Sequence, residues 1–395
     1  MNILTIGHSW VVSNYRKTLR HLAGLPSVNL TALMPDYWEE CSTLMRAQVE
    51  AADCYRVMIR RPVSHRQHLH FYPGVSGVLR EVKPDIVYLL EEPMSVVTAT
   101  VLKAMRRTCP QAKGVFYTFL NDDRDLRRMP GIRRFVFPWA METTFRLASG
   151  ALCASSDAEH QMRVRGFSKP TWKVPFGLSV KEAGEVDSRK VASIRKRIAP
   201  GNEFVVGIVG RVVRAKGIDL LLRGVAGLRQ NGRVAKVVVV GDGEERQALS
   251  ELAAELGIAE RVHWTGTVPN DKVMAYMAAF DVLTVPSRRD GNWVEQFGRV
   301  IVEGKAARVP VIGSSSGEIP NVVGETGFVF KENDHEDLRQ KLQQVYELPS
   351  DQRQSLVERA YAEAVAKFDH ASVAQQYIAC FEQVLEFRHA HRLRT

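Results

Sequence analysis

Short apolar runs that alternate with helix-length stretches constrain the fold of this chain more than any other feature. Runs of this kind are typical of βαβ units, in which helices cover both faces of a parallel sheet. The runs form two sets, one in each half, so the sequence predicts an α/β fold with two doubly wound, Rossmann-like domains. The predicted strands are 2–6, 29–34, 86–90, 114–119 and 150–154, followed by 204–209, 236–240, 262–265, 282–285, 309–313 and 327–329.

The segment 173–180, KVPFGLSV, separates the two sets of predicted strands. Its proline and glycine follow a strand and precede a charged stretch, which is typical of a domain hinge. A chain of 395 residues also exceeds the usual size of one hydrophobic core. We therefore expect an N-terminal domain over 1–175 and a C-terminal domain over 176–370. The last helices, 371–395, have no strand after them and are free to cross back onto the first domain.

Cysteine usage and hydrophobicity favour a cytoplasmic protein. The five cysteines are scattered and form no C-x-x-C pair, which argues against a disulfide framework and a zinc knuckle. No apolar run reaches the roughly 18 to 20 residues that a membrane span needs. The N-terminal MNILTIG leads directly into a strand and lacks the features of a signal peptide.

The net charge of +10 belongs to the first half of the chain. Residues 1–197 contain 30 Lys and Arg against 18 Asp and Glu, whereas residues 198–395 contain 24 against 26. A basic surface attracts phosphorylated substrates, nucleic acid or anionic lipid headgroups. An ordinary solvated surface rich in arginine explains the excess equally well.

The segment that follows the strand 204–209 has the features of an anion site. It contains Gly210 and Arg211 and, before a predicted helix, Lys216 and Gly217. Glycines let backbone amides approach an anion, a helix N-terminus adds positive charge, and the two cations suit a diphosphate. The alternative is an ordinary βα turn with two exposed cations. Neither the P-loop nor the dinucleotide-binding glycine pattern is present.

A second segment, 294–304, contains two glutamates with seven residues between them. Glu295 precedes Gly298, where a loop turns into a helix, and Glu303 lies inside that helix near a predicted core. A buried carboxylate needs a partner, and a pair of sugar hydroxyls is a suitable one. Eight helical positions advance about 12 Å, roughly the reach from a ribose to a hexose across a diphosphate. In the alternative interpretation Glu303 pairs with a structural cation such as Lys305.

The order of these segments resembles glycosyltransferase family 4. The resemblance is dense over about residues 200–345 and loose in the first half. It implies the GT-B fold, with two Rossmann-like domains facing a central cleft, and a hexosyltransferase (EC 2.4) that uses a nucleoside-diphosphate sugar. Retention of anomeric configuration and independence from metal ions are also implied. The motifs are G-R…K-G at 210–217, G-D-G at 241–243, W-T-G-T-V at 264–268, Pro286-Ser287, E-x7-E at 295–303 with F-G inside it, P-V-I-G at 310–313 and G-E-T-G-F at 324–328.

The resemblance also implies roles for individual residues in the second half. Arg211 and Lys216 would bind the donor diphosphate and, with Glu295 at the transferred sugar, form the catalytic group. Glu303 would bind the ribose. The remaining donor-binding positions are Gly210, Val268 beside the nucleobase, and the backbone of Gln296, Phe297 and Gly298.

The first half departs from the family pattern, which usually has a glycine-rich loop after the first strand. Here only Gly7 is present, so His8, Asn14 and Arg16 are candidates for contacting the acceptor. A polar residue satisfied at a strand end is the alternative for His8. Asn121 stands where the family often has a histidine. Glu92, or its neighbour Glu91, follows a middle strand and is a candidate to project toward the acceptor, at the edge where such folds bind ligands.

Two patterns that suggest a metal have simpler explanations, so no metal ion or other cofactor is expected. Asp123 and Asp125 form a D-x-D string, but they precede a basic helical stretch and are explained as helix caps. His65, His68 and His70 lie close together without a second ligand pair, which favours a solvated loop.

These observations predict an enzyme that transfers a sugar from a nucleoside-diphosphate sugar to an acceptor hydroxyl, in bacterial cell-surface polysaccharide or glycolipid synthesis. The expected acceptor is a glycan or lipid-linked saccharide, with an anionic membrane surface as a further partner and a peripheral location at its inner face. Nucleic acid is not expected as a partner, since no binding module is recognisable. A GT-B sugar-nucleotide epimerase and a basic surface-binding module without catalysis remain as alternatives.

Overall fold

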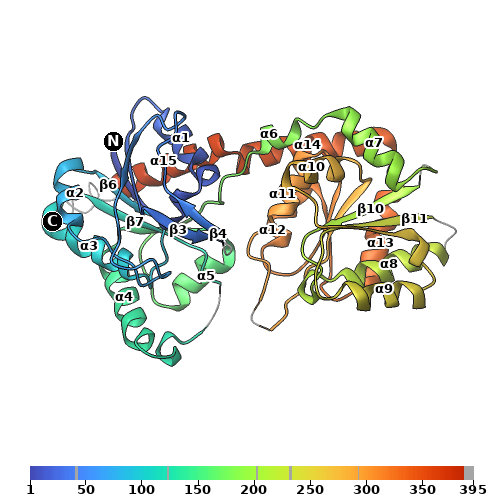
Figure 1. Ribbon diagram of the computed structural model, residues 1–395, viewed down its shortest axis with the longest axis horizontal. Coiled ribbons are helices and arrows are strands. Elements are labelled where there is room, and N and C mark those ends of the chain that lie inside the picture. The colour runs from blue at the N-terminus through green and yellow to red at the C-terminus, as the bar shows by residue number, and fades with distance from the viewer. Residues whose placement is uncertain (41–42, 122–123, 202, 231–233, 292, 387–395) are drawn as a thin grey trace. The chain divides into compact units, whose positions relative to one another are not determined.

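The computed structural model describes residues 1–40, 43–121, 124–201, 203–230, 234–291 and 293–386. The chain forms two compact units, Met1–Gly177 together with the segment from His370 on, and Leu178–Asp369 (Figure 1). The border between Gly177 and Leu178 lies within the predicted hinge, two residues beyond the expected position.

The first unit contains a seven-stranded parallel sheet with the order β5-β2-β1-β6-β7-β8-β9. The five predicted strands of this half are present within one residue at each end. The strands are β1 (Asn2–Ile6), β2 (Asn29–Met34), β5 (Arg56–Ile59), β6 (Ile86–Leu89), β7 (Lys113–Thr118), β8 (Gly150–Cys153) and β9 (Thr171–Lys173).

Helices cover both faces of this sheet because alternate strand residues point to opposite sides. Leu4, Val87 and Phe116 face a cluster formed with α2 (Val75–Val82), α3 (Val96–Thr108), α4 (Arg133–Leu147) and α5 (Ser156–Val164). Their neighbours Ile3 and Tyr88 face the opposite cluster, to which α1 (Lys17–Ala23) contributes. The near-continuous apolar strands of the sequence therefore reflect burial on both faces.

The last described helix, α15 (His370–Glu386), packs in the first unit rather than the second. It lies beside α1, and Figure 1 shows this red helix next to the blue α1. Its Tyr377 and Phe381 are fully buried against Tyr88 of β6, with ring centroids 5.2 and 5.6 Å from that ring. This segment completes the core of the N-terminal unit.

The second unit contains a six-stranded parallel sheet with the order β12-β11-β10-β13-β14-β15. Its strands are β10 (Phe204–Val209), β11 (Ala235–Val240), β12 (Val262–Gly266), β13 (Val282–Val285), β14 (Val311–Ser314) and β15 (Phe328–Phe330). Two apolar clusters again cover its two faces. The helices are α6 (Val180–Gly184), α7 (Ser188–Ile198), α8 (Ile218–Gln230), α9 (Arg246–Glu255), α10 (Asn270–Ala278), α11 (Arg299–Ala306), α12 (Ile319–Val323), α13 (His335–Tyr346) and α14 (Ser350–Phe368).

Four strands of the first unit were not predicted. The hairpin of β3 (Tyr37–Glu40) and β4 (Thr43–Arg46), and the edge strands β5 and β9, are three or four residues long. Of the four residues of β5 only Met58 is buried, and β4 is mostly exposed. Short strands without a buried face give no apolar run that a sequence pattern can reveal.

The strand order reverses once in each sheet. The chain runs from β1 outward to β2 on one side and later returns to β6 on the other side of β1. In the second sheet β10 leads outward to β11 and β12, and β13 then pairs on its opposite side. Ligands of open parallel sheets bind outside the carboxyl ends of the strands at such a switch point. Both groups of predicted site residues follow these strands.

Candidate functional site

The turns after β10 and β11 are built on glycines whose positive φ angles strain any other residue. Gly210 and Gly241 have φ angles of +146° and +141°, and the Gly210 amide donates to the Val240 carbonyl oxygen at 2.9 Å. A Cβ at Gly241 would lie 1.9 Å from the Gly210 carbonyl oxygen. At Gly217, where φ is +64°, a Cβ would lie 2.0 Å from the Pro286 carbonyl oxygen. These close approaches bring the turns after β10, β11 and β13 together at the carboxyl edge.

Lys216 and Glu295 meet at this edge. The Lys216 Nζ donates to Glu295 Oε2 at 2.6 Å, and the Ser287 hydroxyl donates to the same oxygen at 3.3 Å. The Lys216 ammonium also lies 5.1 Å from the centroid of the Trp293 ring. Both charged side chains remain partly exposed, at 21% and 15%. The structure thus joins two residues 79 positions apart in one accessible ion pair.

The backbone of Glu295 is held from the next turn along the sheet. The Glu318 amide donates to the Glu295 carbonyl oxygen at 3.2 Å. A Cβ at Gly317, which has φ +54°, would lie 2.4 Å from that oxygen. The Ser314 hydroxyl donates to the Ser287 carbonyl oxygen and holds the start of the loop. The carboxylate therefore sits on a fixed loop.

The structure corrects two expectations about Glu303. Helix α11 begins at Arg299, after Gly298 in the left-handed conformation, so only part of the interval from Glu295 to Glu303 is helical. The rise of about 12 Å expected for eight helical positions therefore does not apply. Glu303 pairs with Arg299 one turn earlier, Nε to Oε1 at 2.7 Å, and is 23% exposed. Lys305 is buried and pairs with Glu363 instead, Nζ to Oε2 at 2.8 Å.

The other predicted donor-side residues lie in the loops around this edge. Val268, between β12 and α10, and Phe297 are partly buried against the same apolar cluster. The Phe297 ring packs edge-to-face on Phe368 with centroids 5.6 Å apart. Arg211 and Gln296 are exposed.

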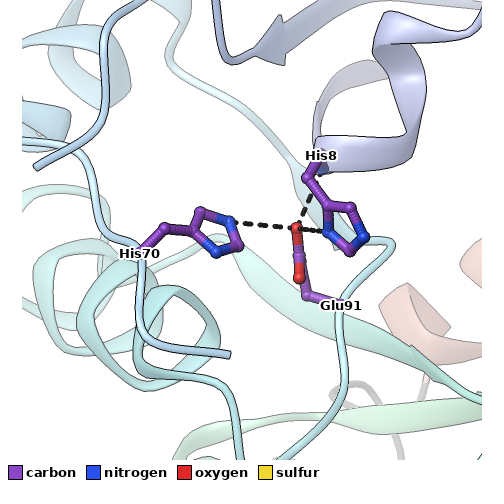
Figure 2. Close-up of side chains that lie close together, drawn as sticks. All are labelled: His8, His70 and Glu91. Atoms are coloured by element: carbon purple, nitrogen blue, oxygen red, sulfur yellow. Dashed lines mark hydrogen bonds and ion pairs between the residues drawn. The ribbon is translucent and has the colours of Figure 1, made fainter. Parts of the chain in front are cut away.

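In the first unit, His8 and Glu91 follow the neighbouring strands β1 and β6. The Glu91 Oε1 atom accepts from the His8 backbone amide at 2.9 Å and contacts His8 Nδ1 at 2.7 Å. His70 comes from the loop before α2, and its Nε2 lies 3.2 Å from the same oxygen (Figure 2). The Trp38 ring lies against both imidazoles, 4.6 Å from His8 and 4.9 Å from His70. We call His8, His70 and Glu91 the imidazole–carboxylate trio.

Burial sets the electrostatics of the trio. The Glu91 and His70 side chains are 1% and 0% exposed, and His8 is 12% exposed. Burial acts to raise the pKa of Glu91, but the two imidazoles outweigh it and hold that pKa well below its usual range. The neighbouring His68 has its pKa lowered to about 4, mainly by burial, although the charge of Glu91 acts to raise it. Glu91 is therefore an ionised acceptor at neutral pH.

The spacing within the trio suits a hydrogen-bonded network better than a metal centre. The three ligand-type atoms lie within 4.8 Å of one another. Two ligands at the roughly 2.0 to 2.1 Å that zinc requires, in tetrahedral geometry, lie more than about 3 Å apart. The 2.7 Å contact between His8 Nδ1 and Glu91 Oε1 is too short for that arrangement.

Most other candidates of the first half have structural partners. Arg16 is 1% exposed and donates to Asp53 and Glu50, so it supports the loop and does not face an acceptor. Glu92 accepts from the Thr118 hydroxyl at 2.6 Å and from the Phe119 amide at 2.8 Å, which fixes the end of β7. Asn14 is exposed in the 3-10 helix Ser13–Arg16, and Asn121 is partly buried after β7.

The three histidines predicted to lie in a solvated loop have separate partners. His65 Nε2 contacts Asp36 at 2.7 Å, His68 Nδ1 contacts Ser95 at 2.8 Å, and His70 belongs to the trio. The solvated-loop prediction is wrong for His70, because Trp38 and Tyr72 cover it. The sequence signal that was overlooked is an apolar, aromatic stretch, HLHFYP at 68–73, which is unusual for a solvated loop.

Asp125 behaves as a cap, as expected, and accepts from the Arg127 amide at 2.9 Å. Asp123, the other member of the D-x-D string, lies outside the described residues. No helix within the described ranges combines the length and hydrophobicity needed to cross a membrane.

Comparison with known proteins finds a family model that matches part of the second unit. A family model described as glycosyl transferases group 1 matches residues 190–363, less than half of the chain. A GDP-mannose-dependent alpha-(1-6)-phosphatidylinositol monomannoside mannosyltransferase from Mycolicibacterium smegmatis is 31% identical over 53% of this chain and 60% of its own length. A 2-deoxystreptamine glucosyltransferase from Streptomyces kanamyceticus is 34% identical over 36% of each chain. The chain thus spans less than two thirds of these curated relatives.

Solved structures match over nearly the whole chain. HepE from Anabaena in complex with UDP has a TM-score of 0.67 at 18% identity and covers 97% of this chain and 100% of its own. A glycosyltransferase from Rickettsia africae has a TM-score of 0.69 at 15% identity and covers 97% and 98%. At these identities the likeness concerns the fold. Together with the two doubly wound sheets, it shows that this chain has the GT-B fold.

Proposed function

We propose that this protein is a glycosyltransferase that moves a sugar from a nucleoside-diphosphate sugar to an acceptor hydroxyl. The observation that carries the proposal is the Lys216–Glu295 pair, which is accessible and fixed among glycine turns at the switch point of the second sheet. The match of residues 190–363 to the group 1 model supports it, as do the curated relatives, which are named as glycosyltransferases.

The arrangement suggests how the residues divide the work. The Lys216 ammonium and the exposed Arg211 guanidinium offer positive charge to a diphosphate, and preorganised charge stabilises a leaving group as its negative charge develops. In the free protein Glu295 keeps Lys216 in position. With a donor bound, the phosphate replaces the carboxylate as the partner of Lys216, and Glu295 turns to the hydroxyls of the transferred sugar. Glu303 remains the proposed ribose ligand, and its carboxylate must leave Arg299 to bind the ribose.

The finer assignment follows the resemblance to glycosyltransferase family 4. We propose retention of anomeric configuration, with Val268 and Phe297 beside the nucleotide. We also propose that transfer needs no metal ion, since two cations stand where the diphosphate is expected. Activity is then expected to persist in EDTA. Loss in EDTA that Mn²⁺ or Mg²⁺ restores contradicts this part of the proposal alone.

The donor is tested most directly by thermal unfolding in the presence of UDP-, GDP-, ADP- and TDP-sugars. A ligand that binds only the folded state stabilises it by about 2.7 kcal/mol at one hundred times its dissociation constant. We expect one nucleotide class to raise the melting temperature and to release nucleoside diphosphate when an acceptor is added. A protein that none of these donors stabilises contradicts the proposed function.

For the acceptor side we propose a glycan or lipid-linked saccharide at the inner face of a membrane, in cell-surface polysaccharide or glycolipid synthesis. The start of α4 exposes apolar side chains beside basic ones. Ile132 and Phe135 are 67% and 66% exposed, with Arg133 and Arg134 between them. Ile132, Phe135 and Trp139 border a groove of about 580 Å³ in the first unit. Apolar side chains flanked by arginines suit the interface of an anionic membrane.

A further inference from the structure

The imidazole–carboxylate trio occupies the position at which a ligand is expected in the first unit. Strands β1 and β6 are parallel neighbours, and Ile6 pairs with Leu89. His8 and Glu91 each lie two residues beyond these partners, so the register sets them opposite each other. The strand order reverses between β1 and β6, which makes their carboxyl ends the switch point of this sheet.

The contacts of Glu91 fix the tautomer of the neutral His8 ring. An ionised carboxylate only accepts hydrogen bonds, so His8 Nδ1, 2.7 Å from Oε1, must be the donor. In the neutral ring the other nitrogen, Nε2, then carries a lone pair and no proton. Figure 2 shows this nitrogen on the side of the ring turned away from Glu91. A carboxylate that orients an imidazole in this way prepares it to accept a hydrogen bond from a hydroxyl group.

The trio is also incompletely satisfied as a purely structural network. Glu91 Oε2, both ring nitrogens of His70 and the Tyr72 hydroxyl are buried without a hydrogen-bond partner among the described residues. A buried polar group left unpaired destabilises the fold, and an apolar side chain would fill the same space without that cost. Such a cost at the carboxyl edge of a sheet indicates that the polar groups serve a ligand.

We propose that His8 is the group that binds the reacting hydroxyl of the acceptor, through Nε2, and that Glu91 and His70 are positioning residues for it. Glu91 holds the ring and its tautomer, and the buried His70 ring packs beside Glu91, with Nε2 3.2 Å from Oε1. The acceptor class that fits is a polyhydroxylated molecule, a sugar or cyclitol, whose hydroxyl donates to Nε2. This inference rests on the proposed function.

Other titratable groups surround the trio and bear on any pH effect. His68 and Tyr72 interact electrostatically with Glu91, Asp36 interacts with Tyr72, and Arg133 with His68. The pKa of Tyr72 is raised well above its usual value by burial, so this hydroxyl stays neutral. The low pKa of His68, about 4, keeps that ring neutral as well near pH 6 to 7.

The test compares His8→Asn with the wild type. The asparagine amide retains a donor near the position of Nδ1 but has no counterpart of Nε2. Release of nucleoside diphosphate is measured with water alone and with D-inositol 3-phosphate or 2-deoxystreptamine as acceptor probes. We expect the acceptor-dependent rate of His8→Asn to fall about 10²-fold, which is the lower range for the loss of a general acid–base group. The nucleotide sugar is expected to raise the melting temperature of the variant as much as that of the wild type. His65→Asn is the matched control, because His65 forms an imidazole–carboxylate pair with Asp36 outside the trio.

The positioning role of Glu91 is tested by the pH profile of Glu91→Gln. The wild-type rate is expected to fall on acidification as Nε2 takes up a proton. A neutral glutamine removes the counter-charge of the imidazolium, so the acidic limb moves to lower pH. If Glu91 has only a structural role, Glu91→Gln lowers the rate equally at every pH. The pH at which the rate falls on acidification then stays unchanged.

The outcomes separate the two proposals. If His8→Asn releases nucleoside diphosphate at the wild-type rate, or falls no further than His65→Asn, the role of His8 is overturned and the donor site stands. If the rate of Glu91→Gln falls at the same acidic pH as that of the wild type, the positioning role of Glu91 is overturned. If no nucleotide sugar stabilises the wild type, the proposed function fails and the role of the trio fails with it.

Discussion

At the switch point of the first sheet, Glu91 is 1% exposed and lies between two imidazoles, whereas at the switch point of the second sheet the Lys216–Glu295 pair is 21% and 15% exposed. The same topological position thus holds a buried network in one unit and an accessible ion pair in the other. A buried carboxylate orients a neighbouring ring, while an accessible cation remains available to exchange its carboxylate partner for a phosphate.

The largest effect is expected where the ion pair is accessible. Lys216→Ala removes charge that a preorganised site directs at the leaving group, and loss of one such contact costs about 10² to 10³ in rate. The measurement is the release of nucleoside diphosphate at saturating donor. Lys236→Ala is the control, because Lys236 pairs with Glu203 at 3.4 Å, with similar exposure, at the amino ends of the same strands. Equal losses in the two variants contradict a role specific to the carboxyl edge.

For stability we expect the larger effect in the first unit, at the buried Glu91, and the smaller effect at the accessible ion pair of the second unit. Glu91→Ala leaves the His8 amide and His8 Nδ1 without their buried acceptor and removes the counter-charge beside His70. We expect this to lower the free energy of unfolding by about 3 kcal/mol. Glu295→Ala breaks a partly exposed pair and is expected to cost about 1 kcal/mol or less. Urea unfolding of both variants measures the difference. A larger loss for Glu295→Ala shows that the burial contrast does not govern stability.

A third carboxylate, Glu363 of α14, makes part of this stability depend on pH in the second unit. Burial acts to raise its pKa, but hydrogen bonds from Lys305, Lys367 and Thr326 outweigh burial and lower it to about 2. A carboxylate whose pKa is lowered by folding stabilises the folded state. This contribution is fully present above the pKa of the unfolded chain, about 4.3, and is lost as the pH falls toward 2. Because Glu363 is partly exposed and solvent screens its charge, we expect Glu363→Gln to lower the free energy of unfolding by only about 1 to 2 kcal/mol at pH 7. Near pH 2.5 the substitution is expected to have little effect. A cost that is independent of pH contradicts this linkage.

The smallest effect concerns the basic surface of the first unit. Each basic residue near an anionic membrane contributes about 1 kcal/mol, which salt screens. Charge reversal at Arg127, Arg128, Arg133 and Arg134 is expected to abolish co-sedimentation with anionic vesicles at low salt. Arg223→Glu, an exposed arginine on α8 of the second unit, is the control. Binding that survives the four substitutions, or that neutral vesicles support equally, shows that the charge is an ordinary solvated surface.

Sequence reasoning performed best where structure is local. The strands 2–6, 29–34, 204–209 and 282–285 were predicted to the residue, because burial on both faces produces continuous apolar runs. Short edge strands such as β5 and β9 were missed, since they bury few side chains. The turn glycines 210, 217 and 298 were identified as site positions, and each has a positive φ.

The sequence by itself determined the alternation of strands and helices, the division into two doubly wound units and the residues that follow β10 and β13. These features depend on local periodicity and on backbone conformations that particular residues adopt. Only the tertiary structure decided that Glu303 pairs with Arg299, that Arg16 is buried and that His70 joins His8 and Glu91. Those contacts depend on sheet order and strand register, which bring His8, His70 and Glu91 together at the carboxyl edge of the first sheet. No local pattern encodes the distance between segments so far apart in the chain.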